Sequence, residues 1–376
     1  MVVSGKRWVQ TSVLASLSVL AWSQSAGACG GGALVSERGV VVNAQRVILS
    51  TRSSGTTDIV AQIGVPSTTA DYGVLIPVPS EPTLDAEPVS ALELAALDDA
   101  TAPQIQREDA SESSAPGCGC GAAGADSSKG GAAPMRGVTA SPPMQIGPVE
   151  AVSLKGESAD AISAWLAENG FALPSEHEAT LASYVGAGNY FIAIRRSETA
   201  ASGAPSSIGI HYTLAGDHRK LSLAFARIGA ANKVAFTVFV ANQQATGPSA
   251  PFAALTLDSL DATLLRTGDY QGAVEAAVQS RGSKAFVLEG VAPRELISDQ
   301  APSIAKLVDA GAVVTRATTV VAREALTEDA IFASPVQGSV PTSRWASRNV
   351  FKSNYANLTP FGVLLLMGLR RRRRAS

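Results

Sequence analysis

The fold of this 376-residue chain is decided by residues 161–196, AISAWLAENGFALPSEHEATLASYVGAGNYFIAIRR. Ile162, Trp165 and Leu166 recur at helical spacing. Asn169-Gly170 follows them, and both residues tolerate the left-handed conformation that a helix end needs. The stretch therefore begins with a short predicted helix.

A second helix and a strand follow within the same stretch. Ser175 stands where an N-cap belongs, and Leu181, Tyr184 and Val185 carry an apolar stripe up to the next glycines. Residues 190–194, YFIAI, are β-branched and aromatic, as is typical of a buried strand. The order is helix, helix, strand, which specifies a scaffold but no chemistry.

Upstream of this unit the pattern predicts β structure. Residues 37–51 and 56–65 are rich in β-branched side chains and are separated by the turn sequence RSSG, so they predict a hairpin. Residues 72–78 are expected to continue the same sheet. Residues 88–97 carry an apolar helical pattern that is typical of a helix covering a core.

Downstream of the unit, four strand-like segments follow one another with short links, at 207–214, 220–227, 232–242 and 251–257. They predict an antiparallel meander. Helices are expected at 269–280 and 302–310, and strands at 285–289 and 312–321. The expected class is α+β, a largely antiparallel sheet with several short helices packed on it.

Several motifs resemble an uncharacterised bacterial envelope family, domain of unknown function 2330. They are WLAENGFALP and ASYVGAGNYFIAIR in the central stretch, ACGGG at 28–32, VLIPVPSEP at 74–82 and VVTRATTVVAREALTEDAIF at 313–332. The resemblance spans roughly residues 28–333 and implies an envelope location and a domain, but no mechanism. Related chains often carry a second cysteine soon after ACGG, where this chain has Ala33-Leu34-Val35-Ser36, so it lacks the local cysteine pair of those chains.

The N-terminus has the pattern of a secretory signal peptide. Lys6 and Arg7 precede an apolar stretch at 9–22, and Ala26-Gly27-Ala28 is a small-residue cleavage site. Cleavage after Ala28 would leave Cys29 at the new N-terminus. Lipidation of Cys29 and an uncleaved anchor are the alternatives, although a lipobox usually has a larger residue where Ala26 stands.

Composition and charge exclude one class of function. Hydrophobic residues make up 46% of the chain but aromatic residues only 5%, which favours sheets packed with small side chains. The net charge of −2 includes seven of the 30 cations in segments that we expect to be removed, so 23 cations against 32 anions give the remaining body a net charge of about −9. Nucleic-acid binding requires a basic face, and this body is acidic.

Residues 111–148 shift to Gly, Ala, Ser and Pro and predict a disordered insertion. Cys118 and Cys120 lie within it, one residue apart. They could bind a soft metal or be oxidised, to each other or with one of them joined to Cys29. We expect oxidation, because a metal site normally needs about four ligands and no histidine lies nearby.

The C-terminus carries a short apolar segment, Leu358 to Leu369, followed at once by Arg370 to Arg374. Twelve helical residues would span only about 18 Å of a hydrocarbon core of about 30 Å, so the segment is too short for a stable span. Five arginines would stay cytoplasmic by the positive-inside rule. The tail resembles bacterial sorting signals that are cut off after export, and a retained weak anchor is the alternative.

Catalytic patterns are sparse. Only His177, His211 and His218 are present, and none has the spacing of a zinc protease site. His211 and His218 flank a turn that contains Asp217, so they could meet across a hairpin, but we expect solvated turn residues. The pair Asp98-Asp99 is expected in a polar turn.

Ser303 and Lys306 have the spacing of a serine nucleophile and its lysine base on one helix face. The partner motifs KTG and SDN are missing, which favours coincidence. No Walker loop and no dinucleotide fingerprint is present, and we predict no cofactor.

The predicted organisation is a signal peptide at 1–28, the N-terminal part of the domain at 29–110, the insertion at 111–148, the main α+β part at 149–340, a spacer at 341–357 and the tail at 358–376. The expected function is that of an exported envelope or surface protein that serves as a non-enzymatic binding or structural module. The alternative is an exported hydrolase that uses Ser303 and Lys306. The expected partners are the export and sorting machinery, the inner membrane and an unknown envelope partner.

Overall fold

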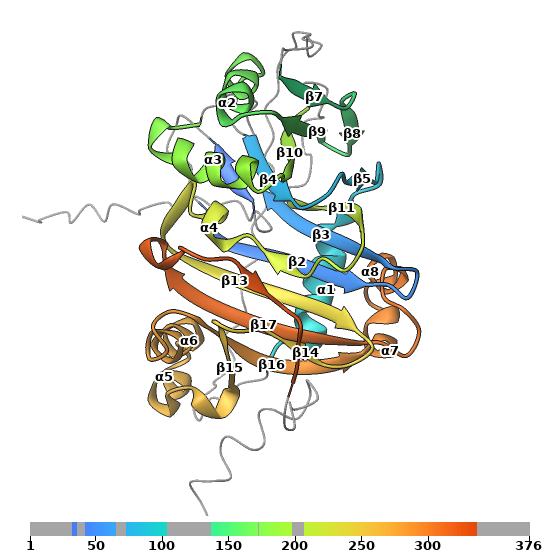
Figure 1. Cartoon of the computed structure of the whole chain (residues 1–376). Helices are drawn as coiled ribbons and strands as arrows, with labels where there is room; N and C mark the ends of the chain where they lie inside the picture. Colours follow the sequence, from blue (N-terminus) through green and yellow to red (C-terminus); the bar gives the residue numbers. More distant parts are fainter. Residues whose placement is uncertain are drawn as a thin grey trace, which may run out of the picture.

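The computed structural model describes residues 32–35, 42–64, 73–103, 137–171, 173–197 and 207–336. Its larger sheet has nine strands, and their spatial order is β15-β16-β17-β13-β2-β3-β11-β5, with β6 also paired to β11 (Figure 1). These strands are β2 (Val42–Thr51), β3 (Thr56–Gly64), β5 (Thr83–Leu84), β6 (Val89–Ser90), β11 (Ser207–Ala215), β13 (Ala230–Asn242), β15 (Ala253–Thr256), β16 (Ala285–Pro293) and β17 (Val313–Ala322).

The smaller sheet has the order β1-β4-β10-β9-β7, with β8 also paired to β9. Its strands are β1 (Ala33–Val35), β4 (Gly73–Val78), β7 (Val138–Ala140), β8 (Met144–Ile146), β9 (Val149–Gly156) and β10 (Tyr190–Arg196). Two short pairs stand apart, β12 (Lys220–Leu221) with β18 (Ala330–Ile331), and β14 (Thr246–Gly247) with β19 (Ser334–Pro335).

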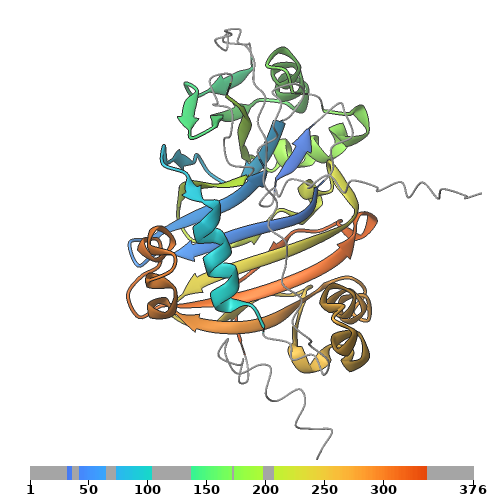
Figure 2. The ribbon, with the colours of Figure 1, turned by 180° about the vertical axis from the view of Figure 1, so that it is seen from behind.

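Short helices cover the sheets. They are α1 (Ala91–Thr101), α2 (Ala159–Glu168), α3 (Glu178–Gly186), α4 (Leu223–Ala226), α5 (Ala262–Thr267), α6 (Tyr270–Gln279), α7 (Arg294–Ser298) and α8 (Pro302–Lys306), with 3₁₀ turns at Ser175–His177, Leu257–Ser259 and Arg323–Ala325. Figure 2 shows α1 lying across the larger sheet beside α7 and α8. The α+β class and the predominantly antiparallel pairing are confirmed, with parallel pairing only for β13/β2 and β15/β16 among the described strands.

The main core lies between the two sheets. Val47, Leu49 and Ile59 from the larger sheet pack in one cluster with Ile76 and Ile192 from the smaller one, all nearly fully buried. Full burial of side chains of this size stabilises each by about 1.5–3 kcal/mol relative to exposure. The two sheets therefore share one hydrophobic core.

The central stretch forms the predicted helix, helix and strand, which are α2, α3 and β10. Trp165 and Leu166 of α2 and Phe191 of β10 belong to one buried cluster, and β10 pairs with both β4 and β9. The side chain of Ser158 caps α2 by accepting from the Ala161 N–H. Ser175 does not cap α3, because it lies in the 3₁₀ turn that precedes this helix.

The hairpin of β2 and β3 is confirmed. Three other predictions, two of strand pairing and one of secondary structure, are wrong. Residues 73–78 do not continue that hairpin; they form β4, which is buried on both faces between β1 and β10 of the smaller sheet. The expected strand at 220–227 is β12 followed by α4, since the buried Leu223 and Ala226 recur at helical spacing. The expected meander is absent from this part of the chain, because β13 lies between β17 and β2.

The predicted insertion also ends earlier than expected. Residues 137–148 include β7 and β8, which both pair with β9, and Ile146 is fully buried in the main core. Pairing with β9 and the burial of Ile146 act against the entropy cost of ordering these short strands. Residues 111–136 lie outside the described residues.

Candidate functional site

Ser303 and Lys306 both lie on the exposed side of α8. The Ser303 N–H donates to Glu93 Oε1 (3.2 Å), and the Lys306 carbonyl accepts from Arg52 Nη1 (2.8 Å). These bonds use main-chain groups of α8 and fix it against α1 and the β2–β3 turn. No hydrogen bond within the described ranges places a general base beside the Ser303 hydroxyl.

The cysteines and the processing and tail residues that the sequence singled out lie outside the described residues. They are Ala28, Cys29, Cys118, Cys120, Leu358, Leu369, Arg370 and Arg374. In the part of the chain that is described, no helix has both the length and the apolar character needed to cross a membrane. The same part contains no group of three or more His, Cys, Asp or Glu side chains that could hold a metal ion.

His211 is not a solvated turn residue, because it lies within β11 with a side chain only 12% exposed. Its Nδ1 lies 3.1 Å from Asp85 Oδ2, and its Nε2 lies 3.1 Å from Asp58 Oδ1. Asp58 also accepts from the Thr213 hydroxyl (2.7 Å). The imidazole therefore joins β11 to β3 and to the segment after β5.

This arrangement favours a charged histidine. Burial alone would lower the pKa of His211, but the hydrogen bonds and charges of Asp58 and Asp85 raise it above 6.5. Burial would raise the pKa of Asp58, yet the bonds from His211 and Thr213 lower it below 3.8. A histidine held between two carboxylates is a poor general base, because it binds its proton too tightly.

The other two histidines have separate partners. His218 Nε2 lies 2.7 Å from the Ala215 carbonyl, and the His218 N–H donates to Thr57 Oγ1 (2.9 Å). His177 Nε2 lies 3.2 Å from Glu176 Oε1 in the turn before α3. The structure thus assigns the three histidines to three different local contacts.

A buried ionic network joins α1 and α6 to the larger sheet. Glu289, fully buried at a bulge of β16, accepts from the Tyr270 hydroxyl and from Arg316 Nε. Arg316 Nη1 lies 2.5 Å from Asp98 Oδ1, and Arg46 Nη2 lies 2.8 Å from Asp98 Oδ2. Asp98 is therefore a helical residue of α1 with two arginine partners, and not part of a polar turn as predicted.

The network is balanced in charge, with two arginines and two carboxylates. Burial and the neighbouring Glu289 raise the pKa of Tyr270, so its hydroxyl stays a neutral donor. Because each charge has a partner of opposite sign, the network links α1 and α6 to the larger sheet and offers no unpaired charge to a ligand.

A second buried contact joins motifs that are far apart in the sequence. The Tyr184 hydroxyl of α3 donates to Asp329 Oδ1 (2.5 Å), which also accepts from the Ala224 N–H (3.1 Å). Lys220 Nζ lies 3.2 Å from the other Asp329 oxygen. The central stretch and the late motif at 313–332 are therefore parts of one folded unit.

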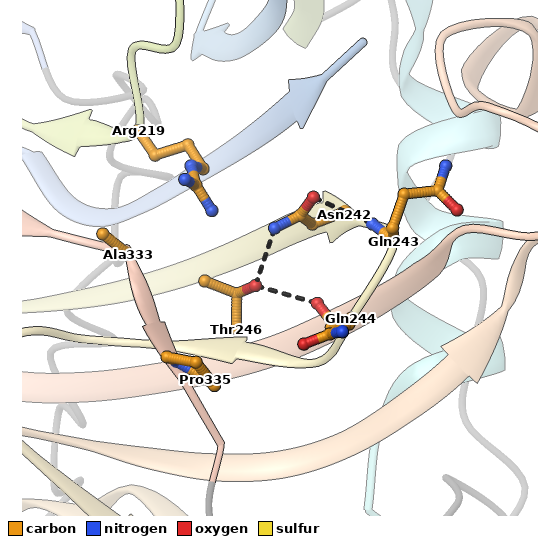
Figure 3. Close-up of a pocket in the computed structure, with 7 residues that line it drawn as sticks. All are labelled: Arg219, Asn242, Gln243, Gln244, Thr246, Ala333 and Pro335. Atoms are coloured by element: carbon orange, nitrogen blue, oxygen red, sulfur yellow. Dashed lines mark hydrogen bonds between the residues drawn. The ribbon is translucent and has the colours of Figure 1, made fainter. Parts of the chain in front are cut away.

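The remaining candidate is a polar pocket of about 200 Å³ beside the β14/β19 pair (Figure 3). Its described lining consists of Arg219, Asn242, Gln243, Gln244, Thr246, Ala333 and Pro335. Asn242 Nδ2 donates to Thr246 Oγ1 (3.1 Å), and that hydroxyl donates to the Gln244 carbonyl (2.8 Å). Thr246 is itself fixed, because its N–H donates to Thr315 Oγ1 (3.1 Å) on β17.

Arg219 reaches toward this pocket from the loop before β12, across from Asn242 (Figure 3). Its Nε and Nη2 donate to the two carboxylate oxygens of Asp217 at 2.7 and 2.5 Å, so the fork is held in one orientation. The Gln243 side chain points away from Asn242 and Thr246 (Figure 3). The pocket presents amides, one guanidinium and the Thr246 hydroxyl, which already donates to the Gln244 carbonyl.

The sequence analysis missed this pocket. Its one local signal was Asn242-Gln243-Gln244, three consecutive amide side chains that begin at the last residue of a buried strand. Arg219 and Pro335 come from distant parts of the chain, and no spacing in the sequence links them to that run.

Comparison with known families gave one match. Residues 24–208 match the family described as an uncharacterised protein conserved in bacteria, DUF2330. The comparisons with curated proteins and with solved structures found no match. The family assignment therefore applies to residues 24–208, which are just under half of the chain.

Proposed function

We propose that this chain is an exported protein of the cell envelope or cell surface that acts as a non-enzymatic binding module. Export is supported by the signal-peptide pattern that ends at Ala28, and a sorting role for the C-terminus by the Leu358–Leu369 segment and the arginines after it. Binding is supported by the composition of the pocket.

The pocket lining is the observation that carries the proposal. Catalysis of acyl or glycosyl transfer requires a nucleophile, an acid or a base within reach of the substrate. The described lining has amides, a threonine hydroxyl that is already bonded, and an arginine paired with Asp217. Such groups recognise polar atoms and hold them without transferring a proton.

The alternative hydrolase is disfavoured by the position of Ser303 and Lys306. A lysine that acts as a base at neutral pH is normally removed from water, whereas Lys306 is exposed. A serine-reactive phosphonate should therefore leave the purified mature protein unlabelled. Covalent labelling that disappears in Ser303→Ala would support the hydrolase and contradict the binding module.

The location is tested separately. An epitope placed after Ser376 should be lost from the surface-exposed pool if the tail is cut off after export. Retention of the epitope on most surface protein would favour a weak anchor. Recovery of the whole pool from the cytoplasm would refute export.

Binding is tested with isolated cell envelopes. The mature protein should sediment with them in a saturable manner, and Ala333→Leu, which places a larger side chain at the exposed edge of the pocket, should weaken this binding. Failure of the unaltered protein to sediment would contradict the binding role.

A further inference from the structure

We infer that the pocket beside β14 and β19 binds the main chain of a short, uncharged peptide with small side chains. This inference rests on the proposed binding function and adds the chemical class of the ligand. It is carried by the hydrogen-bonding groups, the charge and the apolar wall of the pocket.

The first argument is the set of open hydrogen-bonding groups. Within the described residues, Arg219 Nη1 and the Gln244 side-chain amide have no hydrogen-bond partner, whereas Arg219 Nε and Nη2 are both used by Asp217. A glutamine amide carries a donor beside an acceptor, which is the pattern of a peptide group. Arg219 Nη1 adds donors suited to a peptide carbonyl.

The second argument is charge. Arg219 is paired through two nitrogens with Asp217, and its side chain is only 12% exposed. The pairing with Arg219 also lowers the pKa of Asp217, so the carboxylate remains charged. The guanidinium is thus already neutralised, and a ligand carboxylate or phosphate would be repelled by Asp217 as well as attracted by Arg219. An uncharged ligand avoids this conflict.

The third argument is shape. None of the described lining residues is aromatic, so the pocket offers no flat apolar ring on which a sugar could stack. Ala333 and Pro335 instead form a small apolar wall opposite the amides. The volume of about 200 Å³ corresponds to roughly six or seven water molecules. That space suits one or two peptide units with methyl-sized side chains.

The arrangement is also preorganised. Asn242, Thr246 and the Gln244 carbonyl form a continuous hydrogen-bond chain that is anchored on Thr315 of β17. A loop held in this way loses little conformational freedom when a ligand binds. The rigid part of the pocket therefore lies on the larger sheet, and the ligand contacts the open amide and guanidinium groups.

The test uses isothermal titration calorimetry on the full mature protein with three probes, N-acetyl-trialanine amide, trialanine with free termini, and an N-acetylglucosamine oligosaccharide. We expect the capped peptide to bind, with the other two at least tenfold weaker. Stronger binding of the oligosaccharide or of the charged peptide would overturn the assigned ligand class.

Matched variants locate the binding. Arg219→Lys keeps a cation beside Asp217 but removes the planar fork, and Gln244→Ala removes the open amide; each should weaken binding of the capped peptide at least tenfold. Gln271→Ala is the control, since Gln271 is an exposed glutamine of α6 and is not among the lining residues. If all three variants bind the capped peptide as tightly as the unaltered protein does, with unchanged circular dichroism spectra, the assigned site is wrong.

Failure of this inference can be separated from failure of the proposed function. If the protein sediments with envelopes in a manner weakened by Ala333→Leu, but does not bind the capped peptide, the peptide inference is wrong and the binding function stands. If the protein binds neither the envelopes nor the capped peptide, both the peptide inference and the proposed binding function are wrong.

Discussion

Replacing Arg316 by methionine would leave the carboxylate of Glu289 buried without its ionic partner. Glu289 is fully buried, and the side chain of Arg316 is only 9% exposed. Removing one member of a buried ion pair typically destabilises a protein by about 3–5 kcal/mol, because the remaining charge stays desolvated. The Tyr270 hydroxyl can still donate to Glu289 but cannot neutralise it.

Urea unfolding followed by tryptophan fluorescence measures this loss, since Trp165 is almost completely buried. For a slope of about 3 kcal/mol per molar urea, a loss of 3–5 kcal/mol lowers the unfolding midpoint by roughly 1–2 M. The slope itself should not change, because the same surface becomes exposed on unfolding.

Two further variants test the reasoning. Arg46→Met should lower stability by no more than about 1 kcal/mol, because Arg46 is 35% exposed and Asp98 keeps Arg316 as a partner. The double variant Glu289→Leu/Arg316→Met removes both charges and should recover most of the loss. A single Arg316→Met variant that loses less than about 1 kcal/mol, or a double variant no better than the single one, would refute the argument.

The remaining predictions concern pH, packing and the extent of the folded unit. The pKa of His211 is raised above 6.5 in the folded state, so its stabilising contribution is complete below pH 6.5 and is lost as the pH rises through the folded pKa. The difference in unfolding free energy between the wild type and His211→Gln, measured with urea, should therefore shrink from pH 5.5 to pH 9. A difference that grows over this range would contradict the stabilisation of charged His211 by Asp58 and Asp85. Gly209→Ala should destabilise by about 1–3 kcal/mol in thermal or urea unfolding, because its new Cβ would lie 2.7 Å from Val60 Cγ1 and 2.9 Å from Val89 Cβ, and an unchanged midpoint would show that these side chains can move aside. A fragment of residues 24–208 should not unfold cooperatively in circular dichroism, since it lacks β13, the parallel partner of β2, and ends within β11; a sharp transition would show that the family region folds alone.

The sequence alone determined the helices and strands whose own apolar side chains show, by their spacing, which face is buried. The central helices and β10 were predictable because apolar side chains recur at helical spacing around Trp165 and in an unbroken run around Phe191, and both residues are buried as expected. The β2–β3 hairpin was predictable because a short turn leaves little choice of partner. Residues 137–148 were not, because β7 and β8 are short and are ordered by pairing with β9.

Only the tertiary structure decided which strands are neighbours and which polar groups meet. Alternating side chains define the faces of a strand but not its partners, so nothing near β13 indicates that it lies between β2 and β17. The pairing of Glu289 with Arg316 depends on a bulge, and the pocket depends on Arg219 and Asn242 arriving from separate elements. These contacts arise from long-range packing, which fixes distances between residues that the linear order of the chain leaves independent.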